Sequence, residues 1–315
     1  MGTTLLTIAG LPVTTYAAGM TLSLAVCVLA AFFFLKKAGI NPQARQRFVL
    51  LALPLSLLFA RLLYVLIRLP FFLTRPDGLA FRFWQGGYTF WGAIAGVVLA
   101  ARITAATSGI APAALLDALA PSALLMLALG RFCEGLAGQG FGEEALAQLQ
   151  FFPVAITNEW GEWNYAIFLL EGVAALVFLG LVLFRKNPKP LSRFKLSLIL
   201  VCAFQILFES LREDEYLRWG FVRVGQLIAV LILFYLLVDA LFITKDANWR
   251  SPRHFAVTLF LLLTIVLIAL EFALDKTNLP TLPLYGIMMA AVAGKFALLN
   301  KTAVGQGPAR AGSHS

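Results

Sequence analysis

The chain has 315 residues, of which 60% are hydrophobic and only 13% charged, and its mean hydropathy is +0.85. A soluble globular domain carries about 25% charged residues, so the composition excludes an ordinary cytosolic enzyme, a disordered chain and a disulfide-rich secreted module. The net charge of +9 lies in short basic clusters between apolar runs, which favours lipid headgroups over nucleic acid as its partner. The sequence therefore predicts an integral membrane protein of the all-α class.

Apolar runs recur along the whole chain at lengths that suit a membrane. A helix needs about 20 apolar residues to cross the hydrocarbon core. By this measure the sequence predicts a polytopic bundle of nine transmembrane helices, at residues 13–35, 48–73, 87–107, 112–131, 164–184, 194–211, 221–243, 254–273 and 281–299. The first run is not expected to be a cleaved signal peptide, because basic residues follow it instead of preceding it.

The loop charges predict the orientation. Basic clusters follow the first, fifth, seventh and ninth spans, whereas the loop after the fourth span is acidic. The positive-inside rule then predicts that the N-terminus is outside and the C-terminus inside. We expect a flexible cytoplasmic tail over residues 301–315. The sequence does not indicate an oligomeric state.

Ionisable residues at membrane depth are the first functional candidates, because each is costly to bury unless it is paired or takes part in function. Several arginines lie near the same predicted membrane face, and their guanidinium groups suit the bidentate binding of a phosphate. Each Arg–Glu pair could equally be an ion pair that neutralises itself. Lys295, near the end of the ninth span, is expected to reach the inner headgroups. The candidates are Arg61 with Tyr64 one turn later, Arg131, Glu134, Glu171, Glu209 and Arg212.

Glycine is frequent at two membrane boundaries. Gly86 and Gly87 precede the third span, and Gly142 closes a glycine-rich stretch after the fourth. Glycine lets the backbone approach a ligand closely or adopt a positive φ, but it is also common in plain loops. Gly92 and Gly96 have the spacing of closely packed helices. The three cysteines, Cys27, Cys133 and Cys202, lack metal or disulfide spacing, so no metal or cofactor is expected.

Several segments form an ordered pattern along the chain. They are Tyr16, Arg61 with Tyr64, WQGGYTFWGAIAG from Trp84 to Gly96, Asp117 with Pro121, GRFCEGLAGQGFG from Gly130 to Gly142, FQILFESLR from Phe204 to Arg212, and Gly225 with Gln226. In this order they resemble the prolipoprotein diacylglyceryl transferases of the bacterial inner membrane, over about residues 10–243. The resemblance implies a seven-span membrane core over residues 1–243, followed by two additional spans over residues 244–300. Trp91 occupies the position of the family's histidine, and Glu134 that of the first asparagine in the family's signature.

The resemblance implies a multi-pass enzyme of lipoprotein biosynthesis in the bacterial inner membrane. Such an enzyme moves a diacylglyceryl group from phosphatidylglycerol to the lipobox cysteine of a lipoprotein precursor and releases glycerol phosphate. Phosphatidylglycerol, precursor peptides and membrane lipids are then the expected partners, without nucleic acid. The residues that the resemblance assigns to lipid or substrate binding are Tyr16, Arg61, Tyr64, Gly86, Gly87, Trp91, Gly92, Gly142, Arg212 and Gln226.

The implied chemistry needs cations around the phosphate and a base for the thiol. Arg131, with Arg61 and Arg212, could form a preorganised electrostatic clamp. Since Trp91 replaces the family's histidine, we expect Glu134 to be the base, with Glu209 in reserve.

Two other functions stay open. The chain could be a catalytically silent paralogue that binds phospholipid or lipoprotein precursors, or a lipid transporter. A lipid-open cavity shared by the charged residues would favour catalysis, a closed ion-pair network the silent paralogue, and a path to both faces transport.

Overall fold

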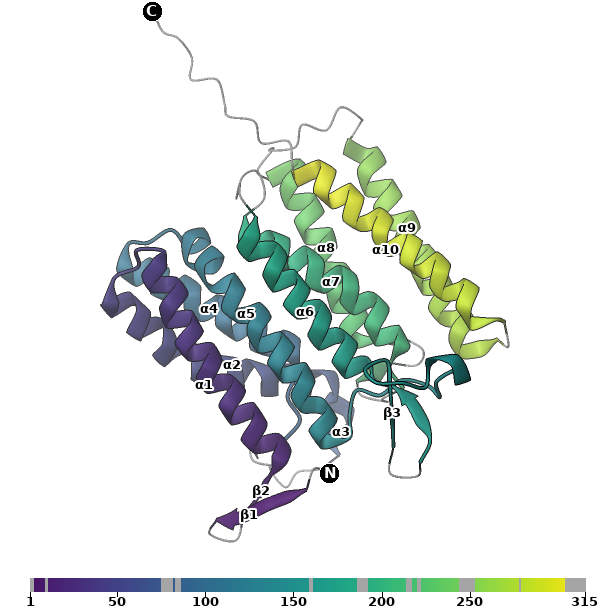
Figure 1. The fold of residues 1–315 in the computed structure, drawn as a ribbon. Helices are drawn as coiled ribbons and strands as arrows, with labels where there is room; N and C mark the ends of the chain where they lie inside the picture. Colours follow the sequence, from purple (N-terminus) through teal and green to yellow (C-terminus); the bar gives the residue numbers. More distant parts are fainter. Residues whose placement is uncertain are drawn as a thin grey trace, which may run out of the picture. The chain divides into compact units, whose positions relative to one another are not determined.

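The computed structural model describes residues 3–8, 11–74, 82, 86–158, 161–185, 192–213, 217–219, 222–243, 253–277 and 279–303. Within these residues, nine helices are long and apolar enough to cross a membrane, which confirms the predicted polytopic all-α class. They are α1 (Thr15–Lys37), α2 (Pro42–Ile67), α4 (Phe90–Ser108), α5 (Pro112–Glu134), α6 (Ile167–Phe184), α7 (Arg193–Leu211), α8 (Val224–Val238), α9 (Arg253–Lys276) and α10 (Thr281–Ala303), as Figure 1 shows. The span of α8 continues to Phe242 through the turn that follows it.

Shorter elements connect these helices. The part of the chain that the structure describes contains three two-stranded antiparallel hairpins: β1 (Thr4–Ile8) with β2 (Leu11–Thr14), β3 (Ala155–Thr157) with β4 (Trp163–Tyr165), and β5 (Arg218–Trp219) with β6 (Val222–Arg223). The remaining elements are the short helix α3 (Leu69–Leu73), the 3-10 turns η3 (Gly135–Ala137) and η4 (Ala147–Leu149), and the π-helical turn η5 (Asp239–Ile243).

The helix boundaries differ from the predicted spans where local hydrogen bonding outweighs hydropathy. The second helix begins at Pro42 instead of residue 48, because the Asn41 side chain accepts a hydrogen bond from the Ala44 amide at 2.7 Å and Pro42 suits the first helical position. Its last predicted residues form the separate helix α3. Residues 163–165 and 222–223 pair in hairpins instead of opening the next helices.

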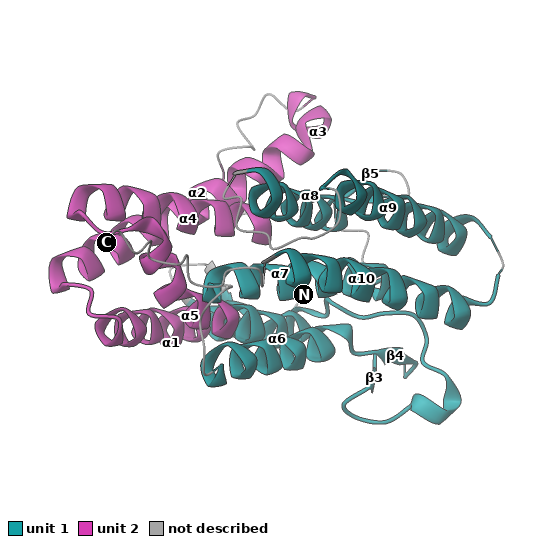
Figure 2. Ribbon diagram, turned by 90° about the horizontal axis from the view of Figure 1, so that it is seen from above, with its two compact units in different colours: residues 1–20, 127–315 teal, residues 21–126 magenta. Residues whose placement is uncertain are grey.

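The chain divides into two compact units, coloured separately in Figure 2. One comprises residues 1–20 and 127–315, and the other residues 21–126, so the boundaries fall inside α1 and α5. This division is by packing, and the predicted division into a core over residues 1–243 and two additional spans stays a prediction.

In the unit of residues 21–126, α2 packs along α4. The backbones approach closely, because a Cβ at Gly92 would lie 2.7 Å from Ala60 Cα and one at Gly96 would lie 2.7 Å from Ser56 Cα. These glycines therefore act as the small residues of a helix interface. A buried apolar core lies beside them, formed by Ala31, Leu35, Phe48, Ala52, Ala100, Ala101, Leu115, Ala118 and Leu119.

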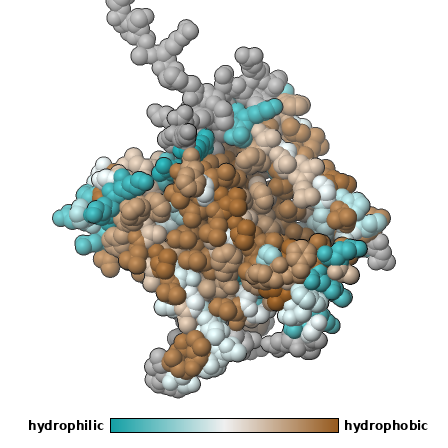
Figure 3. Space-filling model, in the orientation of Figure 1, coloured by the Kyte–Doolittle hydropathy of each residue, from teal (hydrophilic) through white to brown (hydrophobic). Residues whose placement is uncertain are grey.

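In the other unit, α7 packs against α6, α8 and α10, and α10 also packs against α9. Outward-facing helix surfaces in both units are apolar, with Leu29 70% and Phe184 84% exposed. Hydrophobic side chains predominate over the helices on the face in Figure 3. Exposed leucine and phenylalanine on long helices are expected where lipid is the solvent, which identifies a multi-pass membrane protein.

The expectation for Lys295 is wrong. This side chain is fully buried, its Nζ donates to Thr264 Oγ1 at 2.8 Å, and the same atom lies 4.3 Å from the centre of the Phe260 ring. Lys295 faces helix α9 and not the headgroups, so a cation–π contact and one hydroxyl solvate its charge.

Parts of the orientation argument lie outside the described residues. These are the basic residues Lys186, Lys189, Lys245, Arg250 and Arg310, together with residues 304–315 of the predicted tail. Trp84, the first residue of the third-span motif, also lies outside the described residues. The orientation stays a prediction.

Candidate functional site

Four ionisable side chains from three helices meet in the unit of residues 1–20 and 127–315. Arg131 lies in the last turn of α5, Glu134 ends that helix, Glu171 lies near the start of α6, and Arg212 follows the last residue of α7. We call these four residues the ion-pair cluster. All four are among the ionisable candidates of the sequence, although the resemblance gave a role only to Arg131, Glu134 and Arg212.

Each arginine of the ion-pair cluster contacts both carboxylates. Arg131 Nη1 lies 2.6 Å from Glu134 Oε1, and Arg131 Nε lies 2.8 Å from Glu171 Oε2. Arg212 Nη1 lies 2.9 Å from Glu134 Oε2 and 3.2 Å from Glu171 Oε2. Two positive and two negative charges therefore cancel, which lowers the cost of burying them together at the ends of membrane helices. Arg131 pairs with Glu134 as its spacing suggests, whereas Arg212 reaches across to the other helices.

The backbone around Arg212 is fixed by residues far away in the sequence. Arg212 forms an isolated antiparallel bridge with Gly142, and the Glu213 amide donates to the Phe141 carbonyl at 3.0 Å. The Arg223 guanidinium donates to the Arg212 carbonyl. Glycine is needed at position 142, because a Cβ there would lie 2.6 Å from the Leu211 carbonyl oxygen. Gly142 thus belongs to the scaffold that holds Arg212.

Glu209 is connected to the cluster through a neutral side chain. Its Oε1 accepts a hydrogen bond from Gln205 Nε2 at 3.0 Å, and Gln205 Oε1 accepts one from Arg131 Nη2 at 3.3 Å. Tyr16, at the start of α1, is close enough to interact electrostatically with Glu134 and Arg131. Glu209 and Tyr16 therefore lie at the edge of the ion-pair cluster.

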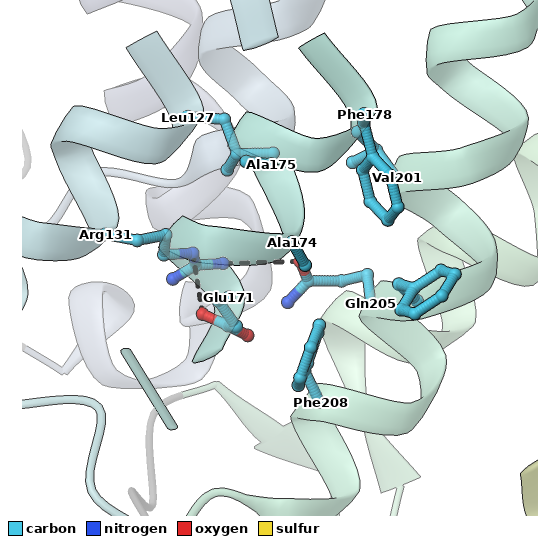
Figure 4. A pocket seen from close by; sticks show the side chains of 10 residues that line it. Leu127, Arg131, Glu171, Ala174, Ala175, Phe178, Val201, Gln205 and Phe208 are labelled. Atoms are coloured by element: carbon cyan, nitrogen blue, oxygen red, sulfur yellow. Dashed lines mark hydrogen bonds and ion pairs between the residues drawn. The ribbon is translucent and has the colours of Figure 1, made fainter. Parts of the chain in front are cut away.

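A cavity of about 10 Å³ lies beside Arg131, Glu171 and Gln205, with apolar side chains around it. Figure 4 shows dashed lines from Arg131 to Glu171 and to Gln205, with Phe178, Val201 and Phe208 among the apolar side chains that line the cavity. This volume suits about one water molecule. This cavity is far too small for a phospholipid headgroup.

Arg61 has a different environment in the unit of residues 21–126. Its Nη1 donates to the carbonyl oxygen of Gly86 and, at 3.2 Å, to that of Gly87. Its guanidinium carbon lies 5.6 Å from the ring centres of both Tyr64 and Phe72. Arg61 is only 4% exposed. We call this group of five residues the Arg61 site.

Two further predicted residues of this unit are buried. Trp91 is 7% exposed and meets Phe90 edge to face, with the ring centres 5.2 Å apart. Gly92 lies in the contact of α4 with α2, where the Thr89 hydroxyl accepts its amide hydrogen bond at 3.2 Å. Both residues are thus part of the helix packing.

Gln226 is held by a residue that the sequence did not bring to notice. The Gln226 amide donates to the Ile206 carbonyl at 3.0 Å and to Glu271 Oε1 at 2.6 Å. Glu271 lies on α9, in one of the two C-terminal spans. Its sequence signal was an isolated carboxylate inside an apolar run, which is costly in a membrane.

Comparison with known proteins identifies the family. The family model described as prolipoprotein diacylglyceryl transferase matches residues 3–242. The chain belongs to this family. It is 29% identical over 240 residues to the phosphatidylglycerol–prolipoprotein diacylglyceryl transferase of Oceanobacillus iheyensis, covering 72% of this chain and 83% of the relative. The Streptococcus pyogenes (serotype M5) protein of the same name is 26% identical over 238 residues, covering 72% of this chain and 90% of its own length.

The family match contains every residue of the ion-pair cluster and of the Arg61 site. It ends before α9 and α10, because α9 begins only at Arg253. The last two membrane helices of this diacylglyceryl transferase family member therefore lie beyond the matched region.

Proposed function

We propose that this protein transfers a diacylglyceryl group from phosphatidylglycerol to the thiol of a lipobox cysteine in lipoprotein precursors. The observation that carries the proposal is the meeting of Arg131, Arg212 and Glu134 at the ends of two membrane helices, inside the region that matches the family. Two guanidinium groups suit a phosphate, and a carboxylate can accept a thiol proton.

Binding of the phosphate is proposed to displace Glu134 from the arginines. The cavity beside Arg131 is too small for a headgroup, so an anion must take over the contacts of a carboxylate. The Glu134 side chain is 20% exposed, compared with 4% for Glu171. Glu134 also precedes the turn Gly135–Ala137 and Gly138, whose φ is +69°. Of the two carboxylates, Glu134 is therefore better placed to move.

The displaced carboxylate then acts as the base. Without its arginines, Glu134 is a carboxylate in an apolar setting, which favours proton uptake. It takes the proton of the lipobox thiol, and the thiolate attacks the glyceryl carbon that carries the phosphate ester. The new S–C bond forms as the C–O bond breaks, and the electron pair goes to the phosphate oxygen. Arg131 and Arg212 stabilise the charge that leaves with glycerol phosphate, and Glu209 is the reserve base.

The other predicted residues are proposed to bind lipid. Arg61 and Tyr64, with Gly86 and Gly87, form a rigid cation–aromatic site, in keeping with contact to a headgroup. The resemblance also assigns this role to Trp91, Gly92, Tyr16, Gly142 and Gln226. No metal or cofactor enters the proposed reaction.

We further propose that the protein lies in the bacterial inner membrane with its N-terminus outside. The loops after Leu35, Phe184 and Thr244 should then be cytoplasmic. Single cysteines introduced into these loops should resist an impermeant thiol reagent in intact spheroplasts and react after lysis. Cys27, Cys133 and Cys202 are buried, so the native thiols should contribute little background. Labelling of any of the three loops from outside would contradict the orientation.

A catalytically silent phospholipid-binding protein is the second candidate. One observation favours it: the four charges of the ion-pair cluster already neutralise one another. The resemblance points the same way, since it places Trp91 at the position of the family's histidine. A neutralised cluster is compatible with catalysis only if the lipid phosphate displaces Glu134 from the two arginines, as proposed above.

One assay separates the two candidates. The purified protein in nanodiscs containing phosphatidylglycerol is incubated with a lipobox peptide, and mass spectrometry follows the peptide. The transferase should add one diacylglyceryl group to the cysteine, and none to a control peptide with serine at that position. Retention of phosphatidylglycerol without any modified peptide would support the silent protein instead.

A further inference from the structure

The carboxylate of Glu271 joins three membrane helices. Glu271 lies on α9, and its Oε1 accepts a hydrogen bond from Gln226 Nε2 at 2.6 Å. Its Oε2 accepts one from Ser210 Oγ at 2.7 Å. Gln226 lies in the first turn of α8, whereas Ser210 lies in the last turn of α7. One side chain from α9 therefore fastens the end of one helix to the start of the next.

Helix α10 reaches the same point. The Tyr285 hydroxyl donates to the Ser210 carbonyl oxygen at 3.2 Å. Ser210 is thus bound through its side chain by α9 and through its backbone by α10. Both helices lie outside the region that matches the family model, which ends at residue 242.

Arg212 lies along the chain between Ser210 and Gln226, the two residues that Glu271 joins. Ser210 precedes Arg212 by two residues, and Gln226 follows Arg223 by three. Arg223 is the residue whose guanidinium donates to the Arg212 carbonyl. The segment that carries Arg212 is therefore anchored at both sides by Glu271, in addition to its bridge with Gly142.

We propose that Glu271 is a positioning residue for Arg212, and that α9 and α10 serve this site as an added clamp. The inference rests on the proposed function only in the role it gives Arg212. A half-buried carboxylate in a membrane helix is costly unless its contacts are needed. Both carboxylate oxygens of Glu271 accept hydrogen bonds, one from α7 and one from α8. Displacement of Arg212 would weaken the hold on the phosphate, because a charged group acts there only in the correct geometry.

The test compares three variants in nanodiscs. Glu271→Ala removes both hydrogen bonds. Glu271→Gln keeps the size and can restore both contacts, because the Ser210 hydroxyl can accept as well as donate. Asp275→Asn is the matched control, since Asp275 lies one turn further on the same helix and pairs with Lys276 at 2.9 Å. Hydrogen–deuterium exchange reports the backbone, and peptide modification at varied phosphatidylglycerol reports turnover.

We expect Glu271→Ala to raise exchange selectively at residues 206–213 and 222–230, and to lower kcat/KM by roughly ten- to a hundredfold, as for a misplaced catalytic group. Glu271→Gln and Asp275→Asn should stay close to the unmodified protein in both measurements. Unchanged exchange at these residues in Glu271→Ala, or an equal rise in all helices, would overturn the proposal. If the unmodified protein shows no transfer, the proposed function fails, whereas the exchange pattern still decides the role of Glu271.

Discussion

The ion-pair cluster and the Arg61 site stabilise buried arginines in different ways. Arg131 and Arg212 contact two carboxylates, Glu134 and Glu171, on side chains that can change rotamer. Arg61 donates to backbone carbonyls and lies beside two aromatic rings. A carboxylate can be exchanged for another anion and can take up a proton, whereas a carbonyl dipole can do neither. The role of a buried arginine is therefore determined by the groups that it contacts, and not by its burial alone.

The largest effect is expected at the centre of the ion-pair cluster. Arg131→Ala leaves Glu134 and Glu171 with Arg212 alone, and breaking a buried pair in this way costs about 3–5 kcal/mol. We expect a lower midpoint of thermal unfolding in detergent and loss of both phosphatidylglycerol binding and transfer. Arg131→Lys should restore the folded protein and only part of the turnover, since a point charge lacks the bidentate fork. Normal binding and transfer in Arg131→Ala would reduce Arg131 to a structural ion pair.

The next effect concerns the carboxylate that is proposed to move. Glu134→Gln removes the negative charge and the proton acceptor but keeps the shape of the side chain. We expect a folded protein that binds phosphatidylglycerol at least as well, because the anion no longer competes with Glu134. Transfer to the peptide should fall by about 10²–10⁴-fold, the usual contribution of a general base.

Glu143→Gln is the matched control for Glu134→Gln, because Glu143 is exposed and follows the same glycine-rich segment. It should leave both binding and transfer unchanged. Undiminished transfer in Glu134→Gln would exclude this base and leave Glu209 as the carboxylate to test.

The Arg61 site offers a pair of adjacent glycines with nearly equal backbone conformation. Gly86 has a φ of +77° and Gly87 one of +76°. A Cβ at Gly86 would meet nothing within 4 Å, but one at Gly87 would lie 2.7 Å from Arg61 Nη1 and 2.9 Å from Tyr64 Cδ1. Gly86→Ala should therefore cost only the left-handed backbone term, about 1–2 kcal/mol.

Gly87→Ala should cost that amount and about 1–3 kcal/mol more from overpacking, and should also weaken phosphatidylglycerol binding. Thermal unfolding and lipid binding of the two variants, measured side by side, give the difference. Equal losses in both would mean that Arg61 and Tyr64 adapt easily, and that the Arg61 site is less rigid than its carbonyl contacts suggest.

Much of the fold was predictable because hydropathy acts over whole segments. The sequence predicts all nine of the described membrane helices, and the predicted boundaries are wrong only near helix ends. At Asn41, for example, a side-chain cap begins α2 among polar residues, before the apolar run starts. The Arg131–Glu134 pair was also accessible, since residues three apart share a helix face.

Contacts between helices were not predictable in the same way. Nothing in the spacing of Glu171 shows that it meets Arg131 and Arg212, because that depends on which face of α6 packs inward. Lys295 shows the same limit, because snorkelling was expected for a residue that in fact faces Thr264 and Phe260. Single sequences give the position of a charge along a helix, whereas its partner depends on tertiary packing.

The smallest effect is expected at the neutral side chain beside the charges. Gln205 Oε1 accepts from Arg131 at 3.3 Å, and its Nε2 donates to Glu209 at 3.0 Å. Gln205→Leu keeps the approximate volume but removes both hydrogen bonds, and each is worth about 1 kcal/mol. Arg131 still has its two carboxylates, so transfer should fall by no more than a few fold while the unfolding midpoint drops slightly. A loss of transfer as large as that of Arg131→Ala would instead show that the link to Glu209 matters as much as the ion pairs, and would make Glu209 the first candidate for the base.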